Sequence, residues 1–236
     1  MLVLLLACFP VPSADAKPAA PPPAPPVPSM GEVVRLHMSQ HLASAIITRD
    51  SVIHGNVSVA REQLSWMANH EEPEPLMDSG RVWVEALHSA ARAGYQGYTV
   101  KEYGLAVGRE GAACAGCHES LKAPLSQVTS TRPAAPKGHA DLSTWAINSM
   151  WTGLIANSDA AWSAGAGALS SLPTDAAGYA VGMPGPAASA ALVTLKEQSG
   201  AAKAASDRVA RGEAFGQVVA ACGSCHAEVG AISPHH

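Results

Sequence analysis

The sequence predicts an all-α protein made of tandem, duplicated four-helix bundles. Apolar residues recur at three- and four-residue spacing along most of the chain, which is typical of helices, and no stretch shows the alternation of a strand. The second half of the chain matches the first half when position 222 is superposed on position 114, an alignment that we call the repeat register. The 236 residues are also enough for two domains of about 100 residues each.

The first half is expected to form four helices. Their periodic segments are residues 32–47, 57–67, 81–93 and 99–119. Gly55 and Asn56 mark a break between the first two helices. The segment 71–80 is interpreted as a turn because it contains two prolines and a glycine, and a Gly/Tyr stretch precedes the fourth helix.

The second half is expected to form four more helices. Their segments are residues 142–155, 159–172, 187–200 and 201–228. The Pro-containing stretch 131–138 lies between the two halves. The body of the chain is therefore divided into a first bundle, an inter-domain linker, a second bundle and a C-terminal tail, with the bounds 31–120, 121–138, 139–228 and 229–236.

The internal repeat depends on glycine, leucine, cysteine and histidine positions, because alanine matches are frequent by chance in an Ala-rich chain. Without any gap, the repeat register relates Leu87 to Leu195, Gly104 to Gly212, and Gly108 to Gly216. The same register superposes the two C-x-x-C-H motifs, residues 114–118 and 222–226. The repeated unit therefore ends in this motif.

The N-terminal residues 1–16 contain the apolar core of an export signal. Two processing sites are compatible with them. A small-x-small site ending at Ala16 would release a soluble protein, whereas "LLAC" resembles a bacterial lipobox and would leave Cys8 lipidated as a membrane tether. The Pro-rich segment 17–30 predicts an extended linker. Both alternatives predict a protein of the periplasm or of the outer face of a bacterial membrane.

The composition limits the classes of function. A net charge of −4 and the lack of a Lys/Arg cluster argue against nucleic-acid binding. Aromatic residues make up only 5% of the chain, and much of the apolar content is alanine, which buries little area per residue. Such a chain would form a thin core unless another apolar body fills it.

The C-x-x-C-H spacing is the attachment signature of haem c. On a helix, positions i, i+3 and i+4 share a face, so the two thiols and the imidazole of each motif point the same way. The thiols can form thioethers with the haem vinyl groups, while the histidine binds iron. A four-cysteine zinc site, redox dithiols and structural disulfides are alternatives, but none explains a histidine at the same place twice.

We therefore expect two covalently attached haem c groups, which would also fill the thin core. The predicted attachment residues are Cys114, Cys117, Cys222 and Cys225, and the predicted iron ligands are His118 and His226.

Four helices with the motif in the last one resemble the cytochrome c′ family, including its low-spin members with a Met ligand. The resemblance covers residues 31–120 and 139–228. It implies that the first helix of each bundle faces the other side of the iron. In the first bundle this helix offers Met38 and His41 as candidate distal ligands.

The second bundle departs from this pattern. The repeat register places Trp145, Ala146 and Ser149 where His37, Met38 and His41 stand in the first bundle, and none of the three binds iron readily. Met150 is one position out of frame and is the candidate distal ligand there, with Met183 as the alternative. The two irons are therefore expected to differ, the second being five-coordinate or Met-ligated.

The remaining histidines, among them His54, His70 and His88, occur singly in mostly polar surroundings, and no metal role is expected of them. The favoured function is a one-electron carrier between redox partner proteins of the periplasm or membrane. The alternative is a cytochrome c′-like protein that binds nitric oxide or carbon monoxide at an open iron in the second bundle. A dihaem peroxidase is disfavoured because its motifs would come early in each domain, and no catalytic residue is assigned.

Overall fold

The computed structural model is all-helical over the residues that it describes, which are 29–123, 134–136, 139–173 and 186–228. Within these ranges the chain forms eight helices and no strand, which confirms the predicted all-α class. The helices are α1 (Met30–Ile53), α2 (Val57–Asn69), α3 (Glu74–Tyr95), α4 (Val100–Leu121), α5 (His139–Ile155), α6 (Asp159–Ser170), α7 (Pro186–Ala202) and α8 (Arg208–Glu228).

Several helix starts are fixed by capping side chains. Ser29 and Glu32 form a reciprocal capping box at the start of α1, and Thr99 and Glu102 form another at the start of α4. Between α1 and α2, Gly55 has a φ of +72°, a conformation that glycine adopts without strain. The break predicted at this position is therefore confirmed.

Two predicted boundaries are wrong. Helix α3 begins at Glu74, inside the segment interpreted as a turn, because a proline in the first turn of a helix gives up no intrahelical hydrogen bond. The last predicted helix is also too long at its start. Helix α7 ends with Ala201 and Ala202, and α8 begins only at Arg208. The side chain of Asp207, the residue before α8, accepts a hydrogen bond from the backbone N–H of Ala210 at 2.9 Å.

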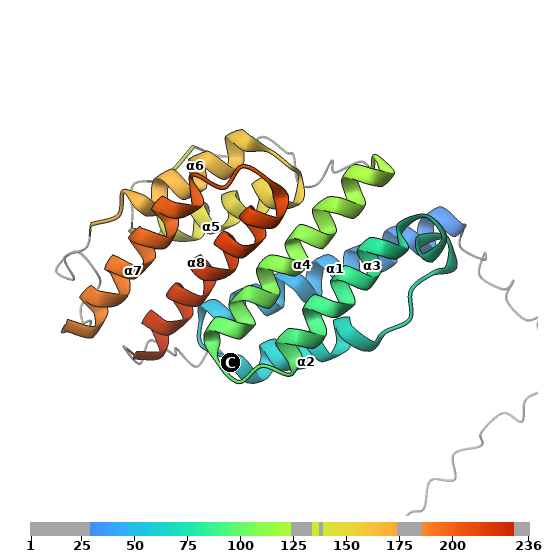
Figure 1. Cartoon of the computed structure of the whole chain (residues 1–236), viewed down its shortest axis with the longest axis horizontal. Coiled ribbons are helices and arrows are strands. Elements are labelled where there is room, and N and C mark those ends of the chain that lie inside the picture. Colours follow the sequence, from blue (N-terminus) through green and yellow to red (C-terminus); the bar gives the residue numbers. More distant parts are fainter. Residues whose placement is uncertain (1–28, 124–133, 137–138, 174–185, 229–236) are drawn as a thin grey trace, which may run out of the picture.

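The helices pack as two groups of four, which lie side by side in Figure 1. In the first helix group, α1 to α4, each helix packs on the next, and α1 also contacts α4. In the second helix group, α5 to α8, the same order of contacts recurs. The most extensive contact of all joins α4 to α8, so the two motif-bearing helices lie together at the centre of the molecule.

Glycines make the close approach of α4 and α8 possible. A Cβ added at Gly104 would lie 2.5 Å from the carbonyl oxygen of Gly216, and one at Gly212 would lie 2.7 Å from that of Gly108. The numbers run in opposite directions along the two helices, so the pair is antiparallel. The two glycines that each repeat contributes therefore pack against the two glycines of the other repeat in a single helix crossing.

The hydrophobic core is continuous across this crossing. One buried cluster extends from Leu64 and Val107 in the first helix group to Trp162 and Phe215 in the second. Among the described residues, no helix combines the length and the apolar character needed to cross a bilayer. The predicted export signal, the C-terminal tail and most of the two predicted linkers lie outside the described residues, as do Cys8, Ala16 and Met183. The ranges that are not described are 1–28, 124–133, 137–138, 174–185 and 229–236.

Candidate functional site

The two C-x-x-C-H motifs lie in the C-terminal halves of α4 and α8. Because the helices are antiparallel and cross near their shared glycines, the motifs lie on opposite sides of the crossing. Each motif centre is about ten residues from the crossing, so the two centres are about 30 Å apart along the helix axes at 1.5 Å per residue. Gly223, in the second motif, lies beside Val52 and Val100, in keeping with this antiparallel arrangement.

The four motif cysteines are partly or fully buried, and no disulfide joins them. Burial raises the pKa of Cys114 to about 12, with the charges of Glu110 and Cys117 adding to the effect. Burial likewise raises the pKa of Cys222 to about 12, with a contribution from Cys225. At neutral pH these groups are thiols, whereas cysteines of redox dithiols have lowered pKa values.

The motif histidines share an unusual feature. The Nδ1 atoms of His118 and His226 are buried, and neither has a hydrogen-bond partner within the protein. Burial lowers the pKa of both rings; for His226 a hydrogen bond with the backbone of Ile53 opposes the effect and the charge of His54 adds to it. An unpartnered buried polar atom costs about 1–3 kcal/mol, so each Nδ1 atom is a hydrogen-bonding position that the protein itself leaves unfilled.

The motif residues fit a covalently attached haem. In each helix, two thiols that form no disulfide and a neutral, incompletely bonded imidazole occupy positions i, i+3 and i+4. The four-cysteine zinc site would need the sulfur atoms of both motifs to converge. The group of candidate metal ligands that the described residues bring together contains no cysteine.

The candidate distal ligands occupy different environments. Met38 in α1 is half-buried, and His41, one turn further on, is buried. Met150 in α5 is completely buried, and a Cβ added at Gly165 in α6 would lie 2.7 Å from its Cγ. It therefore lies between α5 and α6, inside the second helix group.

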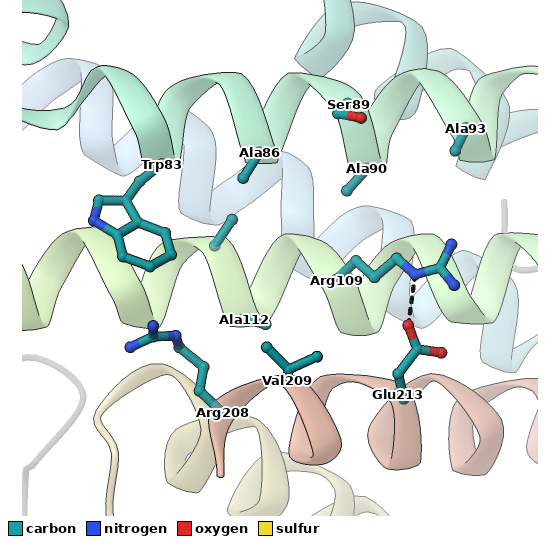
Figure 2. A pocket seen from close by; sticks show the side chains of 11 residues that line it. Trp83, Ala86, Ser89, Ala90, Ala93, Arg109, Ala112, Arg208, Val209 and Glu213 are labelled. Atoms are coloured by element: carbon teal, nitrogen blue, oxygen red, sulfur yellow. Dashed lines mark hydrogen bonds and ion pairs between the residues drawn. The ribbon is translucent and has the colours of Figure 1, made fainter.

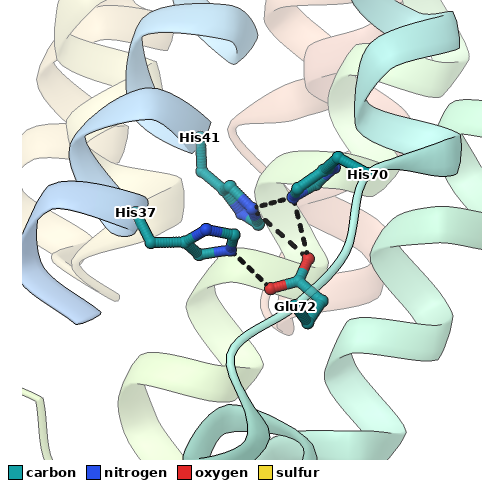
Figure 3. Close-up of side chains that lie close together, drawn as sticks. All are labelled: His37, His41, His70 and Glu72. Atoms are coloured by element: carbon teal, nitrogen blue, oxygen red, sulfur yellow. Dashed lines mark hydrogen bonds and ion pairs between the residues drawn. The ribbon is translucent and has the colours of Figure 1, made fainter. Parts of the chain in front are cut away.

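A cluster of histidines surrounds one carboxylate in the first helix group (Figure 3). The side chain of Glu72, between α2 and α3, is 2% exposed, and its Oε2 lies 2.6 Å from His37 Nε2. Its Oε1 lies 3.3 Å from His41 Nε2 and 3.1 Å from His70 Nε2. The two latter nitrogens are 2.6 Å apart, and His88 Nε2 in α3 is 3.1 Å from the same Oε1. We call these five residues the His/Glu cluster.

The pKa shifts of Glu72 and His70 favour the forms of these two side chains that bind cations. Burial raises the pKa of the Glu72 carboxyl, but hydrogen bonds with His41, His88 and His37 outweigh burial and hold it below its usual range. Burial, together with the charge of His41, lowers the pKa of His70. A carboxylate and a neutral imidazole are the forms in which these side chains ligate metals.

The sequence-based interpretation of His70 and His88 as isolated residues is wrong. His70 ends α2, and its neighbour in space is His41, 29 positions earlier. Glu72 was not singled out either. The only sequence signal for the cluster is the pair His37 and His41 at i, i+4, followed by a histidine and a glutamate two positions apart.

A second buried carboxylate lies on the same helix as the first motif. Glu110 is completely buried, and neither carboxylate oxygen has a hydrogen-bond partner. Burial raises its pKa to about 8. It stands one turn before Cys114, on the same face of α4.

A cleft lies elsewhere, between α3, α4 and α8 (Figure 2). It has a volume of about 380 Å³ and is lined mainly by alanines, with Trp83 and Arg208 at one end and the ion pair of Arg109 with Glu213 at the other. The Arg208 guanidinium lies 4.5 Å from the centroid of the Trp83 ring. No motif cysteine or histidine lines this cleft.

No protein-family model, no curated protein and no solved structure matches the chain.

Proposed function

We propose that the chain is an exported dihaem c-type cytochrome that carries single electrons between redox partner proteins. We also infer that its two helix groups are copies of one cytochrome c′-like haem-binding unit. The observation that carries the proposal is the matched pair of motifs. Each is in the last helix of its group, at the same distance from the shared glycine crossing, with cysteines that form no disulfide and a buried, unpartnered histidine nitrogen.

In this proposal Cys114 and Cys117 hold one haem and Cys222 and Cys225 hold the other. His118 and His226 bind the irons. The haem, when bound, supplies reversible one-electron chemistry at iron. The residues of the chain hold the group, exclude water from it and fix the orientation of each imidazole through the rigid helix that carries it.

Buried apolar side chains next to each motif support this role. Ala113 and Ala115 flank the first cysteine of α4, Ala220 and Ala221 precede that of α8, and all four are buried. A low-polarity surrounding favours the haem state of lower charge.

The proposed location is the periplasm or the outer face of a bacterial membrane, because haem c is attached outside the bacterial cytoplasm. It rests on the apolar N-terminal segment and on the motifs. Lipidation of Cys8 would tether the protein, and cleavage after Ala16 would release it.

An anaerobic redox titration of the mature protein, followed by visible spectroscopy, tests the carrier function. We expect two reversible one-electron equivalents per chain. The double variant Cys222→Ala/Cys225→Ala should take up one equivalent, whereas Ser224→Ala, an exposed position between the two cysteines, should retain both. A protein without a reducible chromophore, or one reduced only irreversibly, would refute the proposal.

The second candidate function is binding of nitric oxide or carbon monoxide at the second iron. One observation favours it: the positions equivalent to His37 and His41 are Trp145 and Ser149, and the Ser149 hydroxyl already donates to the backbone carbonyl of Trp145. A high-spin fraction of the reduced spectrum that shifts on addition of carbon monoxide would support gas binding. A purely low-spin spectrum that carbon monoxide leaves unchanged would support the carrier alone.

A further inference from the structure

The His/Glu cluster is not used by the proposed haem attachment. We propose that His37, His41, His70 and Glu72 form a second kind of metal centre, a mononuclear site for a divalent transition cation of the zinc class. The candidate ligand atoms of these four residues all lie within 4.8 Å of one another. None of the four is a residue of the proposed haem attachment, although Glu72 lies near enough to Cys114 and Cys117 for its charge to add to burial in raising the pKa of both thiols.

The donor set suits such a cation. Three imidazole nitrogens and one carboxylate oxygen are the ligands that Zn²⁺ takes in proteins, and four donors satisfy its tetrahedral preference. His37 and His41 come from successive turns of α1 and share a face, while His70 and Glu72 come from the connection that follows α2. The site therefore joins the first helix of the bundle to the segment that leaves the second.

The surroundings of His70 orient it for this task. Its Nδ1 lies 3.1 Å from the backbone carbonyl of Trp66, which can only accept, so Nδ1 carries the hydrogen. The lone pair of the neutral ring is then on Nε2, which points toward His41 and Glu72. The Trp66 ring stacks on the imidazole with centroids 4.1 Å apart and planes 6° apart. Such outer contacts fix the tautomer and the orientation of metal-bound histidines.

The four candidate ligands are also largely buried. The side chains of His37 and His70 are each 11% exposed, that of His41 is 8% exposed and that of Glu72 is 2% exposed. Ionisable groups this buried are found paired or ligating metals. His88 completes the site as a neighbour of the carboxylate, since its Nε2 is 3.1 Å from Glu72 Oε1.

The proposal also assigns His41. Its Nε2 faces His70 and Glu72, so the inferred role is ligation of the non-haem cation. Met38 remains as the candidate of α1 for the distal side of the first haem.

Zinc binding to the mature, full-length protein tests the site. After incubation with Zn²⁺ and dialysis, metal analysis should find one zinc per chain, counted separately from haem iron. X-ray absorption at the zinc edge should show nitrogen and oxygen ligands at about 2.0–2.1 Å and no sulfur at about 2.3 Å. Wild-type protein that retains no zinc, or that binds it through sulfur, would refute the site.

Variants identify the ligands. Glu72→Gln and His41→Ala should each weaken zinc binding at least tenfold in calorimetric titration, while the haem content stays unchanged. Glu71→Gln is the matched control, since that neighbouring carboxylate is exposed, and it should bind zinc as the wild type does. Equal affinity in Glu72→Gln and Glu71→Gln would overturn the assignment.

The haem spectrum separates the two roles of His41. A loss of low-spin character in His41→Ala, with zinc binding unchanged, would show that His41 ligates the haem and would contradict the site. A colourless protein that still binds one zinc would refute the haem proposal and leave the zinc site in place.

Discussion

Gly108 of α4 lies directly against the backbone carbonyl of Gly212 in α8. The sequence repeat relates these residues to Gly216 and Gly104, which face each other in the same crossing. The contact therefore has the form of a two-fold related helix pair within one chain, in which each surface is its own complement. Its geometry leaves no space for a side chain at any of the four positions.

Replacing Gly108 by alanine should destabilise the protein by about 1–3 kcal/mol, because the added Cβ would collide with the Gly212 carbonyl and force α4 and α8 apart. Gly167→Ala is the matched control. A Cβ at that helical position in α6 meets nothing within 4 Å, so this variant should be stabilised by up to about 1 kcal/mol. Denaturant unfolding measures both changes, and effects of the same sign would contradict the packing described.

The buried carboxyl of Glu110 should make stability depend on pH. Burial raises its pKa to about 8 in the folded protein, whereas the ordinary value is 4.5. The folded state therefore binds more protons than the unfolded state between these values. The free energy of unfolding should fall as pH rises from about 4.5 through 8, by up to about 4–5 kcal/mol at one pKa unit per 1.36 kcal/mol.

The variant Glu110→Gln removes this titration, so the fall in the free energy of unfolding between about pH 7 and pH 8.5 should be lost. The exposed carboxylate of Glu85, on α3, provides the control Glu85→Gln, which should keep the wild-type pH dependence. Denaturant unfolding at several pH values makes the comparison. Equal slopes for wild type and Glu110→Gln would show that Glu110 is not the titrating group.

In the proposed dihaem protein, the potentials of the two haems should be nearly independent of each other. The motif centres are about 30 Å apart along the crossed helices, and two unit charges at this distance interact by about 0.6 kcal/mol, or roughly 25 mV, at an effective dielectric constant of 20. Removing the second haem by Cys222→Ala/Cys225→Ala should therefore shift the potential of the first by no more than about 25 mV. A larger shift in a redox titration would mean that the distance between the haems is shorter than the distance between the motif centres.

Much of the fold follows from local sequence signals. The break at Gly55, the all-α class and the last helix of the first half depend on periodicity and on single residues, which can be recognised without tertiary information. The start of α3 could not be predicted in this way. Proline is unfavourable inside a helix but tolerated in its first turn, and only the position of the helix start separates the two cases.

The candidate site was predictable only where its residues are close in sequence. Each C-x-x-C-H motif is contained within little more than one helical turn and is visible as a pattern. The His/Glu cluster brings residues of α1 together with His70 and Glu72, and their meeting depends on how α2 returns along α1. The role of the repeated glycines was hidden for the same reason, because a close helix approach is a property of the packed pair.

Covalent haem attachment is tested most directly by the mass and absorption of the mature protein made in a host that attaches haem c. We predict a mass above that of the processed polypeptide by two haem groups, and a haem absorption that survives denaturation and chelator treatment. A colourless protein with the mass of the polypeptide alone would contradict the account.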